Sequence, residues 1–223
     1  MERPLYSPSP EHPTQPNFDP VARIYRFAEY LALGPLLQRT RTHFLHDLPP
    51  RHQALVLGDG DGRFLARLLA HRPHLSALAV DTSATMLQLL RHRCQPYIQR
   101  VRTLQASALT VTPPPNTDLI VTHFFLDCLT QAELTTLTQN LAALTAPGTL
   151  WLLSDFALPA NPILRPFAAL YIRSLYFAFR ILTGLRVTHL PDPQSALNAA
   201  GFTRTARHEF LFGLIYTEIW QLH

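Results

Sequence analysis

The stretch Leu55-Val56-Leu57-Gly58-Asp59-Gly60-Asp61-Gly62-Arg63-Phe64 decides the fold of this chain. A short apolar run, typical of a buried strand, leads into a turn with glycine at alternate positions, and helical spacing begins at Phe64. Glycine suits a turn that needs positive φ or a close approach of the backbone to a ligand. A second apolar run, at 77–80, ends in Asp81, a carboxylate suited to both hydroxyls of a ribose. Together the two segments predict a nucleoside-binding βαβ unit.

The composition is that of one folded domain, because 223 residues with 47% hydrophobic side chains can bury one substantial core. The net charge is +4 and every basic residue is Arg, but no basic cluster alternates with aromatic residues, which argues against a nucleic-acid partner. Cys94 and Cys128 lack metal-ligand spacing, so we expect buried free thiols and no metal site. Residues 1–20 are rich in Pro and have no apolar signal core, which predicts a cytoplasmic protein.

The chain divides into a tail, a cap and a main domain. Residues 1–17 indicate a disordered tail, residues 18–48 an N-terminal helical cap interrupted at Gly34-Pro35, and residues 49–223 the main domain. In the main domain, apolar runs predict strands at 54–57, 76–80, 101–105, 118–123 and 149–155, and helical spacing predicts helices at 62–71, 83–93 and 130–144. This alternation predicts an α/β fold, a Rossmann-like, doubly wound and mostly parallel sheet of about seven strands. Residues 202–210 and 214–222 predict a C-terminal β-hairpin at the sheet edge.

The glycine spacing G-x-G-x-G, with its acid about 20 residues further on, resembles the class I S-adenosylmethionine-dependent methyltransferases rather than the dinucleotide-binding proteins. Four further segments, in the family's order, are similar to its second motif, its fourth strand and active-site loop, its Pro-Gly turn and its last helix-to-strand turn: Val80–Leu87, Asp118–Phe125, Leu144–Leu150 and Leu197–Phe202. The resemblance covers roughly residues 54–220. It implies S-adenosylmethionine as methyl donor, S-adenosylhomocysteine as product, and no metal.

The resemblance also implies which residues hold the cofactor. The glycine turn, Gly58, Gly60 and Gly62, would receive the methionine carboxylate, and Asp59 or Asp61 its ammonium. Asp81 would bind the ribose, and the remaining candidates for the adenosine and the sulfonium are Thr82, Met86, Ser107, Ala108, Leu109, Thr122 and His123. Two positions depart from the family pattern, since Val56 and Ser107 stand where acids are usual. For Asp61 a solvated turn residue or helix cap is an alternative role, and for Met86 a core position.

In methyl transfer the leaving thioether is neutral, so no acid is needed, and a base is needed only when the nucleophile arrives protonated. His123, at the end of the fourth predicted strand, is a candidate base and equally a packing residue. Asp127 could orient His123 or bind substrate, or could cap the helix at 130–144. Tyr25, on the N-terminal cap, could close over the sulfonium or belong to the core. We take these three residues as the catalytic candidates.

An aromatic helix predicted at 163–185 carries three arginines, which argues against a membrane span. We interpret it as a lid that lines an acceptor site. A helix buried against the sheet, a homodimer interface and an interfacial membrane contact are the alternatives.

The sequence therefore predicts an enzyme that methylates a small apolar or aromatic molecule on oxygen, nitrogen or sulfur. Two other functions stay open at this point. One is a module that binds the cofactor without catalysis, and the other is an RNA methyltransferase. The active-site loop argues against methylation of nucleic-acid bases. Its residues 122–125 (Thr-His-Phe-Phe) lack the Asn/Asp-Pro-Pro-aromatic pattern that is typical of the enzymes that methylate such bases.

Overall fold

The structure, a computed structural model, describes residues 34–183 and 189–223, and the side chains of 177–183 are left out of the description. The predicted tail (1–17), the first part of the predicted cap and the catalytic candidate Tyr25 lie outside the described residues. The second part of the cap is the helix α2 (Gly34–Thr42). Of the two short helices predicted on either side of Gly34-Pro35, α2 is the second, and the first lies outside the described residues.

Within the described residues the strands form one seven-stranded sheet in the order β3-β2-β1-β4-β5-β7-β6. The first five strands pair in parallel, and β7 runs antiparallel to both β5 and β6. The strands are β1 (Gln53–Leu57), β2 (Ser76–Asp81), β3 (Val101–Gln105), β4 (Leu119–His123), β5 (Leu150–Phe156), β6 (Phe202–Phe210) and β7 (Ile215–Leu222). The strand order reverses between β1 and β4, and ligands of such sheets bind at the carboxyl ends beside this reversal.

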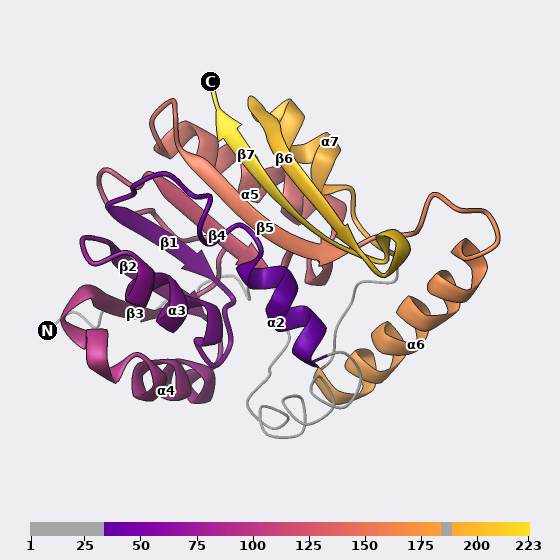
Figure 1. The fold of residues 1–223 in the computed structure, drawn as a ribbon, viewed down its shortest axis with the longest axis horizontal. Coiled ribbons are helices and arrows are strands. Elements are labelled where there is room, and N and C mark those ends of the chain that lie inside the picture. The colour runs from indigo at the N-terminus through magenta and orange to yellow at the C-terminus, as the bar shows by residue number, and fades with distance from the viewer. Residues whose placement is uncertain (1–33, 184–188) are drawn as a thin grey trace, which may run out of the picture.

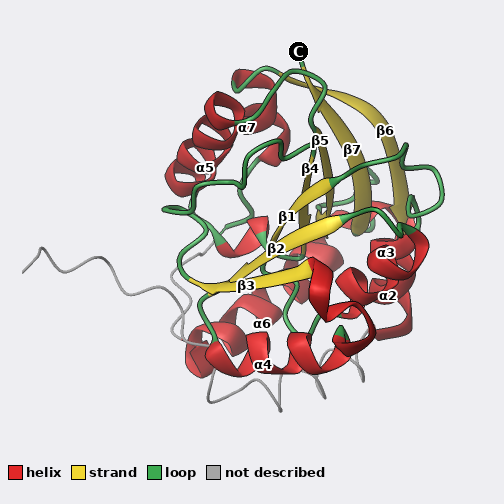
Figure 2. Ribbon diagram, turned by 90° about the vertical axis from the view of Figure 1, so that its left-hand side faces the viewer, coloured by secondary structure: helices red, strands yellow, loops and turns green. Residues whose placement is uncertain are grey.

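Helices cover both faces of the sheet (Figure 2). The helices are α3 (Arg63–His71), α4 (Ala84–Arg93), α5 (Gln131–Leu144), α6 (Arg165–Thr183) and α7 (Pro193–Ala199), with short 3-10 turns η2 (Gln95–Arg100), η3 (Leu126–Cys128) and η4 (Leu211–Gly213). One apolar core joins the sheet to the segment after α2, to α3 and to α4, and it includes Phe64 and Leu68. The other joins the opposite face to α5 and α7 through Leu137, Trp151 and Leu197. The predicted doubly wound architecture and the terminal hairpin are confirmed.

The N-terminus of α5 corrects one alternative for Asp127. The Thr130 hydroxyl accepts from the backbone N–H of Glu133, and the Glu133 carboxylate accepts from the backbone N–H of Thr130, which is a complete capping box. Thr130, and not Asp127, therefore caps this helix. The carboxyl group of Asp127 stays available for another role.

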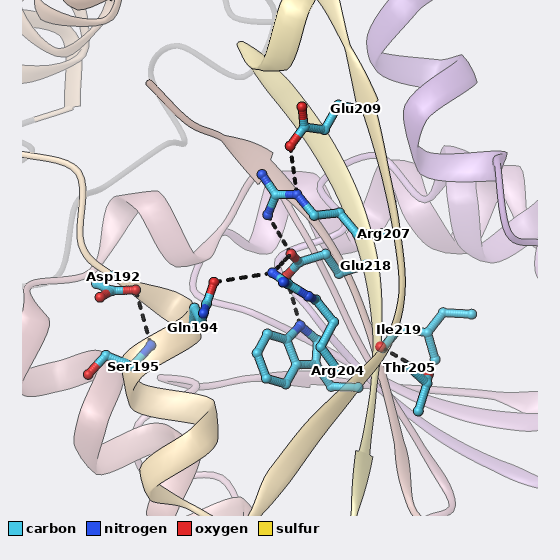
Figure 3. Close-up of polar contacts among 10 residues, drawn as sticks. Asp192, Gln194, Ser195, Arg204, Thr205, Arg207, Glu209, Glu218 and Ile219 are labelled. Atoms are coloured by element: carbon cyan, nitrogen blue, oxygen red, sulfur yellow. Dashed lines mark hydrogen bonds and ion pairs between the residues drawn. The ribbon is translucent and has the colours of Figure 1, made fainter. Parts of the chain in front are cut away.

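A buried acid on β7 joins the two strands of the terminal hairpin (Figure 3). Glu218 is 1% exposed, and its carboxylate accepts from Arg204 at 2.9 Å, from Arg207, and from the indole N–H of Trp220 at 2.8 Å. Glu209 pairs with Arg207 from a more exposed position. A buried carboxylate is tolerated only when it is paired and hydrogen-bonded, as Glu218 is.

The aromatic helix α6 stands beside the sheet rather than on it (Figure 1). Its Ile172 and Tyr176 are buried against a small apolar cluster that includes Phe156 and Leu214. Phe167 and Leu170 are each 69% exposed. The described part of α6 therefore leaves apolar surface uncovered and is not buried along its length against the sheet, as one of our alternatives had it. The described helices include none that is both long and apolar enough to cross a membrane.

Candidate functional site

The glycine turn follows β1, and its three glycines all have positive φ, between 60° and 78°. A Cβ on Gly58 would overlap the ring of Phe125, and one on Gly62 would lie 2.8 Å from Leu90 Cγ. These two glycines therefore permit close packing within the protein. At Gly60 the nearest such atom is Met86 Sδ at 4.0 Å. Gly60 is thus the position of the turn where the backbone is open to a ligand.

The chain leaves β4 through a strained residue. Phe124 has φ 53°, which is unusual for a bulky side chain, and its backbone N–H donates to Ser154 O over 2.7 Å. This bend brings the following residue, Phe125, onto Gly58. Strained backbone of this kind is common at binding and catalytic sites. The end of β4 and the glycine turn are therefore in direct contact.

Asp59 lies inside the turn, and its Oδ2 accepts from the backbone N–H of Leu65 in the first turn of α3 over 3.0 Å. Burial raises the pKa of this carboxyl to about 7, although the hydrogen bond from Leu65 and the charge of Arg41 act in the opposite direction. Asp59 is therefore an acid that exchanges its proton near neutral pH and that a ligand cation would ionise.

Asp61 is occupied by protein partners. Its carboxylate pairs with Arg63 at 3.1 Å and with Arg93 at 2.8 Å, and its side chain is only 11% exposed. Asp61 is thus neither the helix cap nor a freely solvated residue, since the residue before α3 is Gly62. Of the two acids that we considered for the ammonium, Asp59 is the one we carry forward.

Asp81 is the last residue of β2 and is half-buried beside the glycine turn, where Gly58 N donates to Val80 O over 3.0 Å. Its Oδ1 accepts from the backbone N–H of Ser83 over 2.9 Å, which orients the carboxylate at the end of the strand. Met86, in the first turn of α4, is 7% exposed and lies next to Gly60. Met86 therefore adjoins the open glycine, and Asp81 ends the neighbouring strand beside the same turn.

The loop after β3 continues the same edge of the sheet. Ser107 Oγ accepts from the backbone N–H of Leu109 over 3.1 Å, Ala108 is buried, and Leu109 is half-buried. Thr82 is half-buried, and its carbonyl accepts from the Gln105 side chain. These four candidates therefore lie at the carboxyl ends of β2 and β3, beside Asp81.

Thr122 lies elsewhere. It is 1% exposed, and its hydroxyl accepts from the indole N–H of Trp151 over 2.9 Å, within the core under α5. The alternation of side chains along β4 places Thr122 on one face and His123 on the other. We do not carry the Thr122 side chain forward as a cofactor contact.

His123 ends β4 and is 3% exposed, with its ring edge-on to Phe64 at a centroid distance of 4.3 Å. Its Nδ1 lies 2.9 Å from Ser154 Oγ. Among the described residues its Nε2 has no hydrogen-bond partner, although it is buried. Burial, and then the charge of Arg41, holds the pKa of His123 well below its usual range. The imidazole is therefore neutral and presents an unused nitrogen.

Two buried carboxyl groups lie together at the ends of β4 and β5. Asp127 is 7% exposed and Asp155 is 1% exposed, and the backbone N–H of Asp127 donates to Asp155 Oδ2 over 3.1 Å. Burial raises the pKa of Asp127 to about 6, while burial and the charge of Asp127 raise that of Asp155 well above its ordinary value. Asp155 therefore favours its protonated form more strongly than Asp127, whose carboxyl group can act as a base near neutral pH.

The helix α6 contacts this carboxyl pair. The Tyr176 hydroxyl donates to the backbone carbonyl of Asp127 over 3.1 Å, and Cys128 Sγ lies 3.6 Å from Asp127 Oδ1. The apolar cluster around Ile172 and Tyr176, which includes Phe156, adjoins the pair. Acid–base chemistry and apolar surface therefore occur side by side at this end of the sheet.

Our reading of the sequence missed Arg41, Phe125, Asp155 and Tyr176. Asp155 had a usable signal, because it stands near the carboxyl end of a predicted parallel strand, as Asp81 does. Arg41 reaches the site from the last turn of α2, where its guanidinium lies 5.1 Å from the centroid of the Phe124 ring. No spacing in the sequence distinguishes it from the neighbouring arginines.

The doubly wound sheet, its glycine turn and the acid that ends β2 define the class, and residues 55–150 match the family model of a methyltransferase domain. Residues 55–150 are therefore those of a methyltransferase domain, and the fold is the one shared by the class I S-adenosylmethionine-dependent methyltransferases.

The chain is 25% identical over 197 residues to the ubiquinone/menaquinone biosynthesis C-methyltransferase UbiE of Syntrophotalea carbinolica, which covers 86% of this chain and 82% of that protein. Its fold is similar to that of an O-methyltransferase family protein from Burkholderia thailandensis, with a TM-score of 0.68, 16% identity and coverage of 90% of this chain and 59% of the other. It is also similar to the mitomycin 7-O-methyltransferase MmcR, with a TM-score of 0.68, 15% identity and coverage of 93% and 61%. The chain thus spans about three fifths of the length of these two structures.

The residues present fit S-adenosylmethionine. The open backbone at Gly60 and the ionisable Asp59 would hold its amino acid part, Asp81 its ribose, and Met86 its adenine. Within residues 34–183 and 189–223, no group of three or more His, Cys, Asp or Glu side chains could hold a metal ion.

Proposed function

We propose that this methyltransferase acts on a small aromatic molecule that carries an ionisable hydroxyl group. The observation that carries the proposal is the buried Asp127–Asp155 pair, which adjoins the apolar cluster beneath α6. A base is needed only for a nucleophile that arrives protonated, and a neutral phenol-type hydroxyl is such a nucleophile. The buried acid pair therefore favours a hydroxyl-bearing acceptor over a thiolate.

The residues have distinct roles in this proposal. When bound, S-adenosylmethionine supplies an electrophilic methyl group and leaves as a neutral thioether, so the leaving group needs no acid. The Asp127 carboxylate takes the proton of the acceptor hydroxyl, and the protonated Asp155 stabilises that carboxylate beforehand. Tyr176 fixes the backbone of Asp127, and His123 offers Nε2 as a hydrogen-bond acceptor. Alignment of the reacting atoms supplies the rest of the acceleration.

The aromatic character of the acceptor rests on α6. The helix presents exposed Phe167 and Leu170 beside the buried Ile172 and Tyr176. We propose that α6 is a lid over the acceptor, which would cover part of this apolar surface when a ligand is bound. The relatives named above include a C-methyltransferase of ubiquinone and menaquinone biosynthesis and a mitomycin 7-O-methyltransferase, which is compatible with an aromatic or quinone-like acceptor. The two free cysteines suit a reducing compartment such as the cytoplasm.

The test is a transfer assay with methyl-labelled S-adenosylmethionine and a matched panel of acceptors. The panel holds an aromatic alcohol, amine and thiol on the same ring system, together with bulk RNA. We expect label in the alcohol, on the oxygen or on the ring carbon that its ionisation activates. Label only in the amine, only in the thiol or only in RNA would contradict the proposal.

A further inference from the structure

His123, Ser154 and Thr217 form a line across three neighbouring strands. In the sheet register His123 of β4 lies opposite Ser154 of β5, and Ser154 lies opposite Thr217 of β7. Residues that are paired in this way project from the same face of the sheet. All three are buried, at 3%, 1% and 0% exposure.

Hydrogen bonds join the three side chains and end on a backbone carbonyl. His123 Nδ1 lies 2.9 Å from Ser154 Oγ, Ser154 Oγ lies 3.0 Å from Thr217 Oγ1, and Thr217 Oγ1 lies 3.0 Å from Leu153 O. A carbonyl oxygen can only accept, so the Thr217 hydroxyl must donate its single proton there. The Ser154 hydroxyl then donates to Thr217, and it can only accept from His123. The proton of the neutral imidazole must therefore be on Nδ1.

We infer that Ser154 and Thr217 are positioning residues that hold His123 as the Nδ1–H tautomer and thereby keep Nε2 as a lone pair for a ligand's N–H or O–H group. The tautomer of a histidine is set by the hydrogen bond that its other ring nitrogen makes. Here that bond is fixed by two hydroxyls with no freedom to reverse. The unpartnered, buried Nε2 is the observation that points to a ligand, because buried polar atoms are otherwise paired.

This inference extends the role of His123 in the proposed function, but its test needs no methyl acceptor. The test is nitrogen NMR on the uniformly ¹⁵N-labelled full chain, with the His123 ring signals assigned by their loss in His123→Gln. We expect Nδ1 to resonate as a protonated nitrogen and Nε2 as an unprotonated one. If Nε2 carries the proton in the unmodified protein, the inference is wrong.

The matched variants are Thr217→Val, which removes the hydroxyl at nearly constant shape, and Thr217→Ser, which keeps it. In Thr217→Val the Ser154 hydroxyl is released and can donate to Nδ1, so we expect Nε2–H signal to appear. Thr217→Ser should retain the original tautomer, and this comparison separates the hydroxyl from a purely structural effect. If the tautomer of His123 is the same in both variants, the Thr217 hydroxyl does not determine it.

A kinetic comparison adds a second readout once an acceptor is known. We expect kcat for a hydroxyl acceptor to fall about tenfold in Thr217→Val and to stay within about twofold in Thr217→Ser, with KM for S-adenosylmethionine unchanged. A fall of kcat in Thr217→Val without a change of the His123 tautomer would also contradict the inference that Thr217 acts through that tautomer. A failure to find any acceptor would count against the proposed function alone, since the spectra would still decide the tautomer.

Discussion

The backbone N–H of Asp127 donates to Oδ2 of Asp155 over 3.1 Å, so the turn after β4 is tied to the end of β5 by a carboxyl group that is itself buried. This bond joins two strands on the far side of the switch point from the glycine turn. Most of the cofactor candidates lie in the glycine turn after β1, at the end of β2, in α4 and in the loop after β3, whereas Thr122 and His123 lie on β4. In the proposed function, the residues for the methyl donor and those for the acceptor therefore lie mainly on opposite sides of the switch point.

Asp127 should govern the pH dependence of methyl transfer. Its pKa is raised to about 6, and a carboxyl acts as a base only when ionised, so the rate with a hydroxyl acceptor should rise as the pH increases through about 6 and then level off. Asp127→Asn should lower kcat about 100-fold and remove this dependence. The control is Asp47→Asn, an exposed residue, which should leave the profile unchanged. A rate that falls as the pH rises through 6 would refute the assignment.

Asp59 should link cofactor binding to proton release. Its pKa is raised to about 7 in the free protein, and contact with an ammonium group requires the carboxylate. The affinity for S-adenosylhomocysteine should therefore increase with pH, by up to about tenfold per unit below 7, and level off above it. Titration calorimetry at several pH values measures this change. In Asp59→Asn the dependence should disappear, and a pH-independent affinity in the unmodified protein would exclude the role.

Asp81 should bind the ribose of the cofactor. Loss of its hydrogen bonds to two hydroxyls in Asp81→Ala should weaken S-adenosylhomocysteine binding by at least about tenfold. The control is Ser83→Ala, which removes the neighbouring cap bond to Met86 N and should cost about 1 kcal/mol of stability without a comparable loss of affinity. Equal affinity of the Asp81 variant and the unmodified protein, by calorimetry, would remove Asp81 from the site.

Gly60 should be required for cofactor binding rather than for folding. Gly60 and Gly148 both have positive φ, and neither has an atom closer than 4.0 Å to an added Cβ. Alanine at either position should therefore cost a similar amount, about 1 kcal/mol, of unfolding free energy in urea. Only Gly60→Ala should weaken cofactor binding, by at least about tenfold, because its methyl group would occupy the ligand's approach. If the Gly148 variant loses as much affinity for the cofactor, the loss in Gly60→Ala comes from backbone strain and not from a blocked binding site.

Glu218 should be important for stability. Its side chain is 2% exposed, and its removal in Glu218→Ala leaves Arg204, Arg207 and the Trp220 indole without their shared partner. We expect a loss of about 3 kcal/mol in the free energy of unfolding. Glu209→Ala removes a half-exposed partner of Arg207 and should cost less than about 1 kcal/mol. Similar losses in the two variants would show that burial does not distinguish the two acids.

The strand and helix pattern was predictable because it depends on local spacing. The predicted strand at 101–105 matches β3, and the predicted hairpin strand at 202–210 matches β6. The second of the two short helices predicted around Gly34-Pro35 is α2, with Pro35 in its first turn. Proline is accepted there because its missing N–H would have no partner.

The candidate site was only partly predictable. The turn at Gly58–Gly62 and the acid Asp81 follow from the sequence, because glycine at positive φ and an acid at a strand end have few other uses. The partners of each side chain do not follow. Arg93 of α4 forms an ion pair with Asp61, and the Trp151 indole on the neighbouring strand donates a hydrogen bond to the Thr122 hydroxyl. Neither contact is indicated by the sequence around the residues involved.

The sequence by itself determined the class of fold, the position of the glycine turn and the acid that accompanies it, because periodicity and turn chemistry act over a few residues. Only the tertiary structure decided which acids are paired, which are buried and which histidine nitrogen is left over. Asp155 is hydrogen-bonded to Asp127, and Ser154 is hydrogen-bonded to both His123 and Thr217, because the strand order and register bring these residues together. Those relations span from 28 to 63 residues of chain, and they depend on the whole sheet being assembled.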